Sequence, residues 1–189
     1  MLNLAAAVVA YLIGSIPTAY LIGKYLRGID ISKNGTGNIG AMNAFEVTRS
    51  KTIGITVGAI DIAKGTLVTF VAMNLFGLVT GLVASLFVVL GHNYSVYMDF
   101  KGGRGLATSA GAFLVLAPLA IGAYLLIYYG LRLLGLKLYL SSVLGILAAA
   151  ILVVWNFSSS ITGIIVSGTL MLVVLSKHLI PLRNELRNV

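Results

Sequence analysis

Long apolar runs alternate with short polar stretches along this chain, and the runs predict membrane-spanning helices. A helix needs about 20 apolar residues to cross a hydrocarbon core of about 30 Å. The first run is interpreted as a retained helix kinked near Pro17, because no clear cleavage site for a signal peptide ends it. The second run is long enough for two spans, with a turn near residues 74–77. The apolar runs cover residues 4–25, 52–97, 106–134, 139–155 and 160–175, and a basic tail follows the last.

Charge placement decides how the chain passes through residues 106–134, where Pro118 interrupts the apolar run. If the chain reverses at Pro118, it has seven spans, and the Lys and Arg residues outside the spans all fall on one side. Without that reversal, Arg132 and Lys137 change sides and the pattern is lost. Because Lys and Arg gather in cytoplasmic loops, the sequence predicts an all-α polytopic membrane protein. It has about seven transmembrane helices, with the N-terminus outside and the C-terminus cytoplasmic.

Composition excludes the main soluble classes of protein. Of the 189 residues, 59% are hydrophobic and only 10% are charged, against about 25% charged in a typical soluble domain. A soluble chain of this length could not bury so much apolar surface, and disorder requires the opposite balance. We expect residues 1–189 to form a single integral membrane domain. The net charge of +8 is assigned to cytoplasmic loops and not to a nucleic-acid partner, and the absence of cysteine excludes Cys-ligated metals.

The first polar stretch that suggests chemistry is residues 35–43, Gly-Thr-Gly-Asn-Ile-Gly-Ala-Met-Asn. It has the glycine spacing of a dinucleotide fingerprint, but that motif requires a preceding strand, and here an apolar helix precedes it. Glycines let the backbone approach an anion, and successive N–H groups can cradle it. A flexible turn between helices accounts for the glycines equally well. The candidate anion ligands are Gly35, Thr36, Gly37, Asn38, Gly40 and Asn43.

A second stretch, residues 101–105, places two cations around a pair of glycines at the expected start of a helix. Helix N-termini favour anions, and an Arg fork can bind phosphate with two hydrogen bonds. A basic loop that touches lipid headgroups is the alternative. Three glycines within four positions favour a phosphate site over that alternative. The candidate phosphate ligands are Lys101, Gly102, Gly103, Arg104 and Gly105.

Four ionisable residues inside or beside the apolar runs need a separate explanation. His92 and His178 both lie near predicted cytoplasmic ends of spans. They are weak evidence for a metal, and a histidine bonded to a backbone carbonyl is the preferred interpretation. Asp61 and Lys64 are three residues apart on one helix face, which predicts a structural ion pair. A proton or substrate path is the functional alternative for this pair.

Three segments together resemble a known family. Residues 35–43, residues 61–65 (Asp-Ile-Ala-Lys-Gly) and residues 91–108, which begin Gly-His-Asn-Tyr-Ser-Val-Tyr, are similar to motifs of the bacterial acyl-phosphate-dependent glycerol-3-phosphate acyltransferases, the PlsY type. The resemblance covers most of residues 11–111. It implies seven helices, a cytoplasmic-side active site and transfer of a fatty acyl group from acyl phosphate to the 1-hydroxyl of glycerol 3-phosphate. The product would be lysophosphatidic acid, and no metal or cofactor is expected.

The resemblance also implies roles for individual residues. Catalytic roles fall to Thr36, Asn43, Arg49 and His178, and supporting roles to His92, Asp61 and Lys64. Phosphate-binding roles fall to Gly35, Gly37, Asn38, Gly40, Lys101, Gly102, Gly103, Arg104 and Gly105.

The chain departs from the family pattern at Met42, Glu46 and Pro181, and the change at position 46 matters most. Glu46 stands where the family has an arginine, and a carboxylate repels phosphate at short distance. Arg49 lies three residues further on, and one helix could present both side chains in the same direction. We therefore expect Arg49 to supply the missing cation.

Two further functions stay open at this point. A small transporter or flippase for an anionic lipid or metabolite would use the intramembrane charges, although the polar residues gather at one predicted face. A diverged member with another acceptor or without catalysis would explain Glu46 and Pro181. For the acyltransferase, the expected partners are acyl phosphate, glycerol 3-phosphate and membrane lipids, and the expected location is the plasma membrane.

Overall fold

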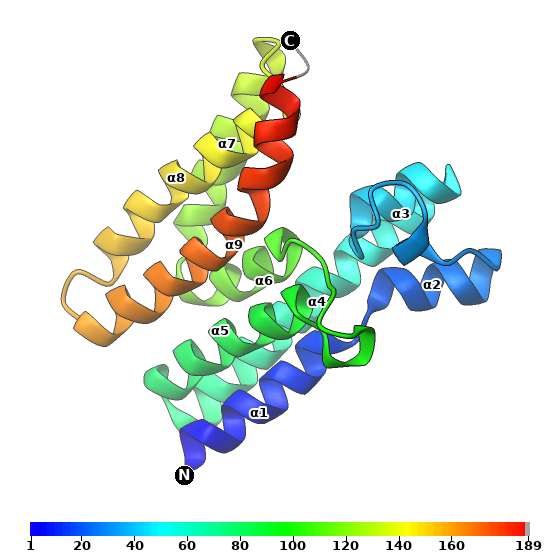
Figure 1. Cartoon of the computed structure of the whole chain (residues 1–189). Helices are drawn as coiled ribbons and strands as arrows, with labels where there is room; N and C mark the ends of the chain where they lie inside the picture. The colour runs from blue at the N-terminus through cyan, green and yellow to red at the C-terminus, as the bar shows by residue number, and fades with distance from the viewer. Residues whose placement is uncertain (188–189) are drawn as a thin grey trace. The chain divides into compact units, whose positions relative to one another are not determined.

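The structure is a computed structural model that describes residues 1–187, and every regular element within them is a helix. Figure 1 shows their arrangement within each part of the chain. In chain order the elements are α1 Leu2–Ser15, α2 Thr18–Arg27, η1 Ile31–Lys33, α3 Ala41–Thr48, α4 Lys51–Phe76, α5 Leu78–Asn93, η2 Val96–Met98, α6 Leu106–Leu116, α7 Pro118–Leu133, α8 Leu138–Asn156 and α9 Ile161–Arg187.

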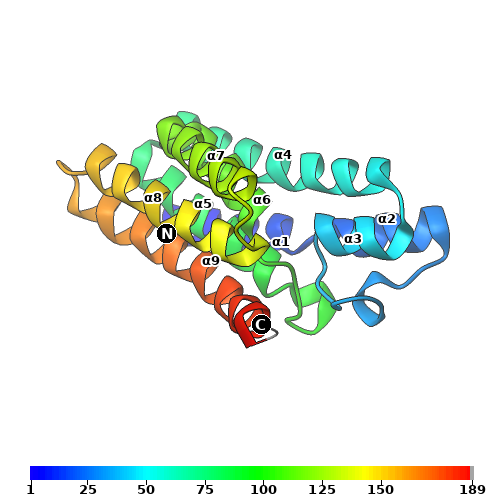
Figure 2. The same cartoon turned by 90° about the horizontal axis from the view of Figure 1, so that it is seen from above.

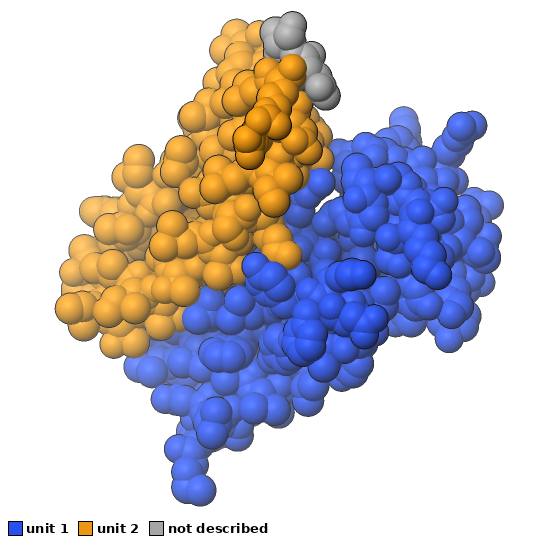
Figure 3. Space-filling view, viewed as in Figure 1, with its two compact units in different colours: residues 1–112 blue, residues 113–189 orange. Residues whose placement is uncertain are grey.

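The chain divides into two compact units, residues 1–112 and 113–189, which Figure 3 colours separately. The first unit holds both glycine-rich stretches, and α6 begins in it and ends in the second unit. The single membrane domain expected over residues 1–189 stays a prediction.

Pro17 separates α1 from α2, as the sequence predicted. Proline has no backbone N–H and cannot continue the hydrogen-bond ladder, so α1 ends at Ser15 and α2 begins at Thr18. The turn between α4 and α5 is equally short. It consists of Gly77 alone, whose φ of +87° glycine adopts with little strain. The turn lies within the predicted residues 74–77.

Helices α1 and α5 run side by side in the same direction, and α4 runs against both. At one end the Thr80 hydroxyl donates to Asn3 Oδ1 at 2.8 Å, and at the other the Tyr11 hydroxyl donates to the Tyr94 carbonyl at 2.5 Å. Gly91 permits the close approach, because a Cβ there would lie 2.1 Å from the Tyr11 carbonyl oxygen. The helix ends at Ser15 and Asn93 thus lie at the same end of the unit.

A small apolar cap closes this end of the first unit. Figures 1 and 2 show α2 and α3 beside the first half of α4. Ser50 caps α4 by accepting a hydrogen bond from the Ile53 amide, and the chain can then turn from α3 into α4. The buried side chains of the cap are Ala19, Ile31, Ile39, Ala44, Ile53 and Val57.

The second unit packs α7, α8 and α9 together. The helix α9 runs to Arg187, so it extends beyond the predicted end of the last span at residue 175 and into the basic tail. Charge ends the apolar run there but not the helix. Glu185 anchors the added turns, because its carboxylate accepts hydrogen bonds from the Tyr139 and Leu140 amides at the start of α8.

Within residues 1–187, seven apolar helical segments lie where the sequence predicts spans. Five are long and apolar enough to cross a membrane, and α6 and α7 are shorter. The break at Pro118 is present, since α6 ends at Leu116 and α7 begins at Pro118. The number of spans and the orientation of the termini stay predictions.

Candidate active site

The first glycine-rich stretch is a loop built around the buried side chain of Asn43. The Asn43 Oδ1 accepts hydrogen bonds from the Thr36 amide at 2.8 Å and the Thr36 hydroxyl at 3.1 Å. Its Nδ2 donates to the carbonyls of Ile31 and Asn34, both at 3.1 Å. The catalytic role implied for Asn43 stays a prediction, but the structure gives this side chain a positioning role, because its amide group is committed to the loop.

Two glycines allow the chain to bend around Asn43. Gly35 and Gly37 have φ angles of +61° and +69°, which glycine adopts without strain. A Cβ on Gly35 would lie 2.3 Å from Asn43 Oδ1, so no other residue fits there unchanged. The loop entrance is fixed by Asp30, whose carboxylate accepts hydrogen bonds from the Ser32 amide and hydroxyl. These bonds, chiefly the one from the hydroxyl, lower the pKa of Asp30.

The loop leads into the N-terminus of α3. Gly40 is the N-cap residue, and no side chain caps the helix. The first amide groups of an α-helix have no intrahelical partner and favour an anion. Thr36 is exposed and Asn38 half-buried in the loop just before them. This end of the loop therefore offers backbone and side-chain donors together.

The expected arrangement of Glu46 and Arg49 on one helix is wrong. The helix α3 ends at Thr48, and Arg49 is its C-cap residue with a left-handed φ of +52°. Both Glu46 and Arg49 are exposed. Since the backbone turns at Arg49, the spacing of three residues does not bring the two side chains onto one helix face. The catalytic role of Arg49 stays a prediction that no longer rests on this geometry.

The second glycine-rich stretch rests on the end of α5. The Gly103 amide donates to the His92 carbonyl at 2.9 Å. A Cβ on Gly102 would lie 2.2 Å from the His92 carbonyl oxygen, and one on Gly105 would lie 2.4 Å from Asn93 Oδ1. The glycines therefore let the loop lie against α5, a constraint that anion binding alone does not explain.

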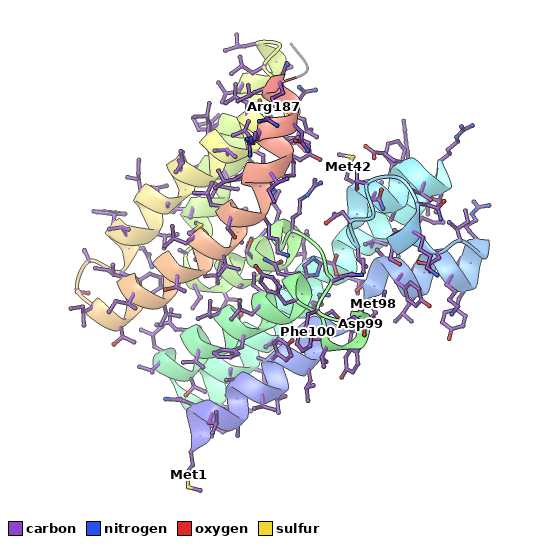
Figure 4. All side chains as sticks on the ribbon, viewed as in Figure 1. Met1, Met42, Met98, Asp99, Phe100 and Arg187 are labelled. Carbon is purple, nitrogen blue, oxygen red and sulfur yellow. The ribbon has the colours of Figure 1, made fainter. Side chains whose placement is uncertain are left out.

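The two loops lie at the same end of the first unit. Met98, which precedes the second loop, packs against the apolar cap that contains Ile31 and Ile39. Figure 4 labels Met98, Asp99 and Phe100 in the segment between α5 and that loop. Lys101 is exposed and Arg104 half-buried. The unit thus brings two glycine-rich loops and two cations to one end, although their binding of phosphate stays a prediction.

Three of the four ionisable residues form one buried cluster. Lys64 Nζ lies 2.9 Å from Asp61 Oδ1, so the structural ion pair is present. His92 Nδ1 lies 3.6 Å from the same carboxylate oxygen. His178 belongs to the second unit, where its Nδ1 lies 2.8 Å from the Val174 carbonyl oxygen. That contact matches the preferred interpretation, and a place for His178 beside the loops stays a prediction.

Sequence reasoning missed Asn93 and Thr108. Both side chains are fully buried, and neither the Asn93 amide group nor the Thr108 hydroxyl has a hydrogen-bond partner within the described residues. Asn93 lies against Gly105, and Thr108 is in the first turn of α6. The available signal was a polar residue within an apolar run and close to one of its ends.

Apolar helices with polar loops at one end of the first unit define a polytopic membrane protein with a candidate anion site. The chain belongs to the family of glycerol-3-phosphate acyltransferases, whose model matches residues 4–187. The resemblance seen in its motifs is therefore confirmed.

Individual relatives agree with this assignment. Glycerol-3-phosphate acyltransferase 2 of Moorella thermoacetica is 43% identical over 152 residues, which are 80% of this chain and 78% of that protein. The crystal structure of PlsY (YgiH), an integral membrane glycerol 3-phosphate acyltransferase, has a TM-score of 0.87 in its glycerol 3-phosphate form. Its lysophosphatidic acid form has a TM-score of 0.85. Both forms are 27% identical to this chain, covering 98% of it and 92% of their own length.

Proposed function

We propose that the protein transfers a fatty acyl group from acyl phosphate to the 1-hydroxyl of glycerol 3-phosphate and so forms lysophosphatidic acid. The observation that carries the proposal is the match of residues 4–187 to the glycerol-3-phosphate acyltransferase family. The two glycine-rich loops at one end of the first unit support it, because both substrates carry phosphate.

In the proposed reaction, the acceptor hydroxyl oxygen attacks the acyl carbon. An ester bond forms, the bond from the acyl carbon to the phosphate oxygen breaks, and inorganic phosphate leaves. The hydroxyl proton passes to the phosphate or to solvent. An acyl phosphate is already activated, so catalysis needs chiefly positioning and stabilisation of charge on the leaving phosphate.

In this proposal each glycine-rich loop binds the phosphate of a different substrate. The donors of residues 35–40 and the N-terminus of α3 bind the acyl phosphate, and Asn43 holds their loop in shape. Lys101 and Arg104 bind the phosphate of the acceptor with the glycine backbone of residues 102–105. Arg49 completes the part of the reaction centre that the first unit provides, on the cytoplasmic face of the plasma membrane, and the catalytic role implied for His178 stays a prediction.

The transporter alternative receives no support from the buried charges. A transport path requires polar groups that a substrate can reach. Asp61 and Lys64 are buried, and the Lys64 ammonium is engaged by Asp61 and by the backbone carbonyls of Gly14 and Ile16. These contacts favour a structural use of the pair.

The test is an assay of the purified protein with palmitoyl phosphate and labelled glycerol 3-phosphate. We expect lysophosphatidic acid and phosphate to form in equal amounts, and no product when palmitoyl-CoA replaces the acyl phosphate. Lys101→Ala should weaken acceptor use, while Lys51→Ala, a matched change of another exposed lysine, should not. Product from palmitoyl-CoA alone would overturn the proposed donor.

A further inference from the structure

A buried charged cluster links three helices of the first unit to the second glycine-rich loop. Asp61 and Lys64 of α4 are 1% and 8% exposed, and His92 at the end of α5 is 8% exposed. The Asp61 carboxylate lies 2.9 Å from the Lys64 ammonium and 3.6 Å from His92 Nδ1. The desolvation cost of a buried ion pair can exceed the energy of its attraction, so the cluster requires a use that compensates this cost.

Lys64 joins the cluster to the break between α1 and α2. Besides Asp61, its ammonium donates to the carbonyls of Gly14 and Ile16 at 3.2 and 3.1 Å. The last carbonyls of a helix have no intrahelical partner, and a cation there is favourable. Two of the three N–H donors of the ammonium group thus have carbonyl acceptors, and its contact with Asp61 is an ion pair. The Lys64 ammonium is therefore held between the carbonyls at the end of α1 and the Asp61 carboxylate. Its attraction in turn fixes the position of that carboxylate.

His92 joins the cluster to the loop. Its carbonyl accepts the Gly103 amide, and a Cβ on Gly103 would lie 2.0 Å from its Nε2. The next nearest atoms to that Cβ are also atoms of the imidazole ring. The loop thus lies against the Nε2 edge of a ring whose other nitrogen faces Asp61. A shift of the ring would displace the segment between Lys101 and Arg104.

We infer that Asp61, held by Lys64, is a positioning residue that fixes the His92 ring and, through it, sets the Lys101–Gly105 loop for the acceptor phosphate. The inference rests on the proposed function for the identity of the ligand, but not for the order of the loop. An ion pair that merely ties α4 to α1 would affect both substrates alike. Positioning of this loop affects the acceptor and leaves the donor unchanged.

Steady-state kinetics separate the two roles. Asp61→Asn should raise the KM for glycerol 3-phosphate at least tenfold and leave the KM for acyl phosphate within twofold. The double variant Asp61→Asn/Lys64→Met removes both charges together, and it provides the same measurement if the single variant does not fold. Equal changes in both KM values, or an unchanged acceptor KM in a folded variant, would overturn the inference.

A second pair of variants tests the contact between ring and loop. Gly103→Ala should raise the acceptor KM, because the new Cβ would meet the ring. The matched control is Gly58→Ala, whose Cβ would lie 3.6 Å from the Ala41 Cβ, an ordinary contact. The variant His92→Ala/Gly103→Ala should have the acceptor KM of His92→Ala alone, since the clash needs the ring. A KM raised by the product of the two single effects would mean that the changes act independently and would contradict the inference.

A spin label provides a readout that needs no turnover. The chain has no cysteine, so Phe100→Cys, at a side chain that is 63% exposed, gives a single labelling site beside the loop. We expect a slowly moving label in the parent and a faster one after Asp61→Asn. If the parent lacks acyltransferase activity but the label responds, the proposed function fails and the positioning role stands. An unchanged label would overturn the positioning role itself.

Discussion

The most informative single change in the first loop is Asn43→Ala. The Asn43 side chain is 1% exposed and makes four hydrogen bonds with the loop that it organises. A typical hydrogen bond contributes about 1 kcal/mol net, and bonds of one group are not additive. We therefore expect the closed form of the loop to lose about 2–4 kcal/mol relative to open forms. By the usual factor of ten per 1.4 kcal/mol, its open population rises roughly 30- to 700-fold.

The assay is hydrogen–deuterium exchange of a peptide that covers residues 31–40. Local opening of a loop controls such exchange when closing is fast, so the rate should rise by the same factor while peptides of α4 and α5 are unchanged. The matched control is Asn74→Ala, which removes one exposed hydrogen bond, to the Phe70 carbonyl at 2.9 Å. Equal exchange of residues 31–40 in Asn43→Ala and the parent would refute the bracing role of Asn43.

Three other predictions address charge at this end of the unit. Arg104→Ala and Lys101→Ala should each raise the KM for glycerol 3-phosphate about tenfold or more, since a charge-assisted hydrogen bond contributes about 1.5–3 kcal/mol. An unchanged KM would mean that the loop contacts lipid headgroups and does not bind the acceptor. Arg49→Gly suits the left-handed backbone at that position and should abolish turnover at saturating acceptor without loss of folded protein, whereas Glu46→Arg should be tolerated. The lowered pKa of Asp30 means that its stabilisation of the loop is complete above the unfolded value of about 3.9 and is lost as the pH falls through the folded value; the protection of residues 31–40 against exchange, taken relative to the intrinsic exchange rate at each pH, should therefore fall in acid, and Asp30→Asn should remove that dependence.

The sequence predicted the helices well because hydrophobic periodicity and proline act locally. Pro17 and Pro118 interrupt helices where expected, and the turn at Gly77 lies within the predicted range. The end of α9 was missed, because the contact of Glu185 with the start of α8 joins residues 45 or more apart. A contact between such distant residues cannot be recognised from the local pattern of apolar and polar residues.

The candidate site was predictable in its residues but less so in their roles. Motif spacing identified both glycine-rich loops. It did not reveal that Asn43 faces inward or that glycines of the second loop pack on His92 and Asn93, because these are contacts between distant elements. The expected geometry of Arg49 was wrong for the same kind of reason. An i,i+3 argument assumes a continuous helix, and α3 ends one residue earlier.

Acyl transfer from palmitoyl phosphate to glycerol 3-phosphate by the purified protein is the decisive measurement. We expect lysophosphatidic acid and inorganic phosphate in a ratio of about one to one, with saturation in both substrates. Omission of either substrate should stop ester formation. A folded preparation that forms no lysophosphatidic acid from palmitoyl phosphate, with glycerol 3-phosphate present in excess, would contradict the account.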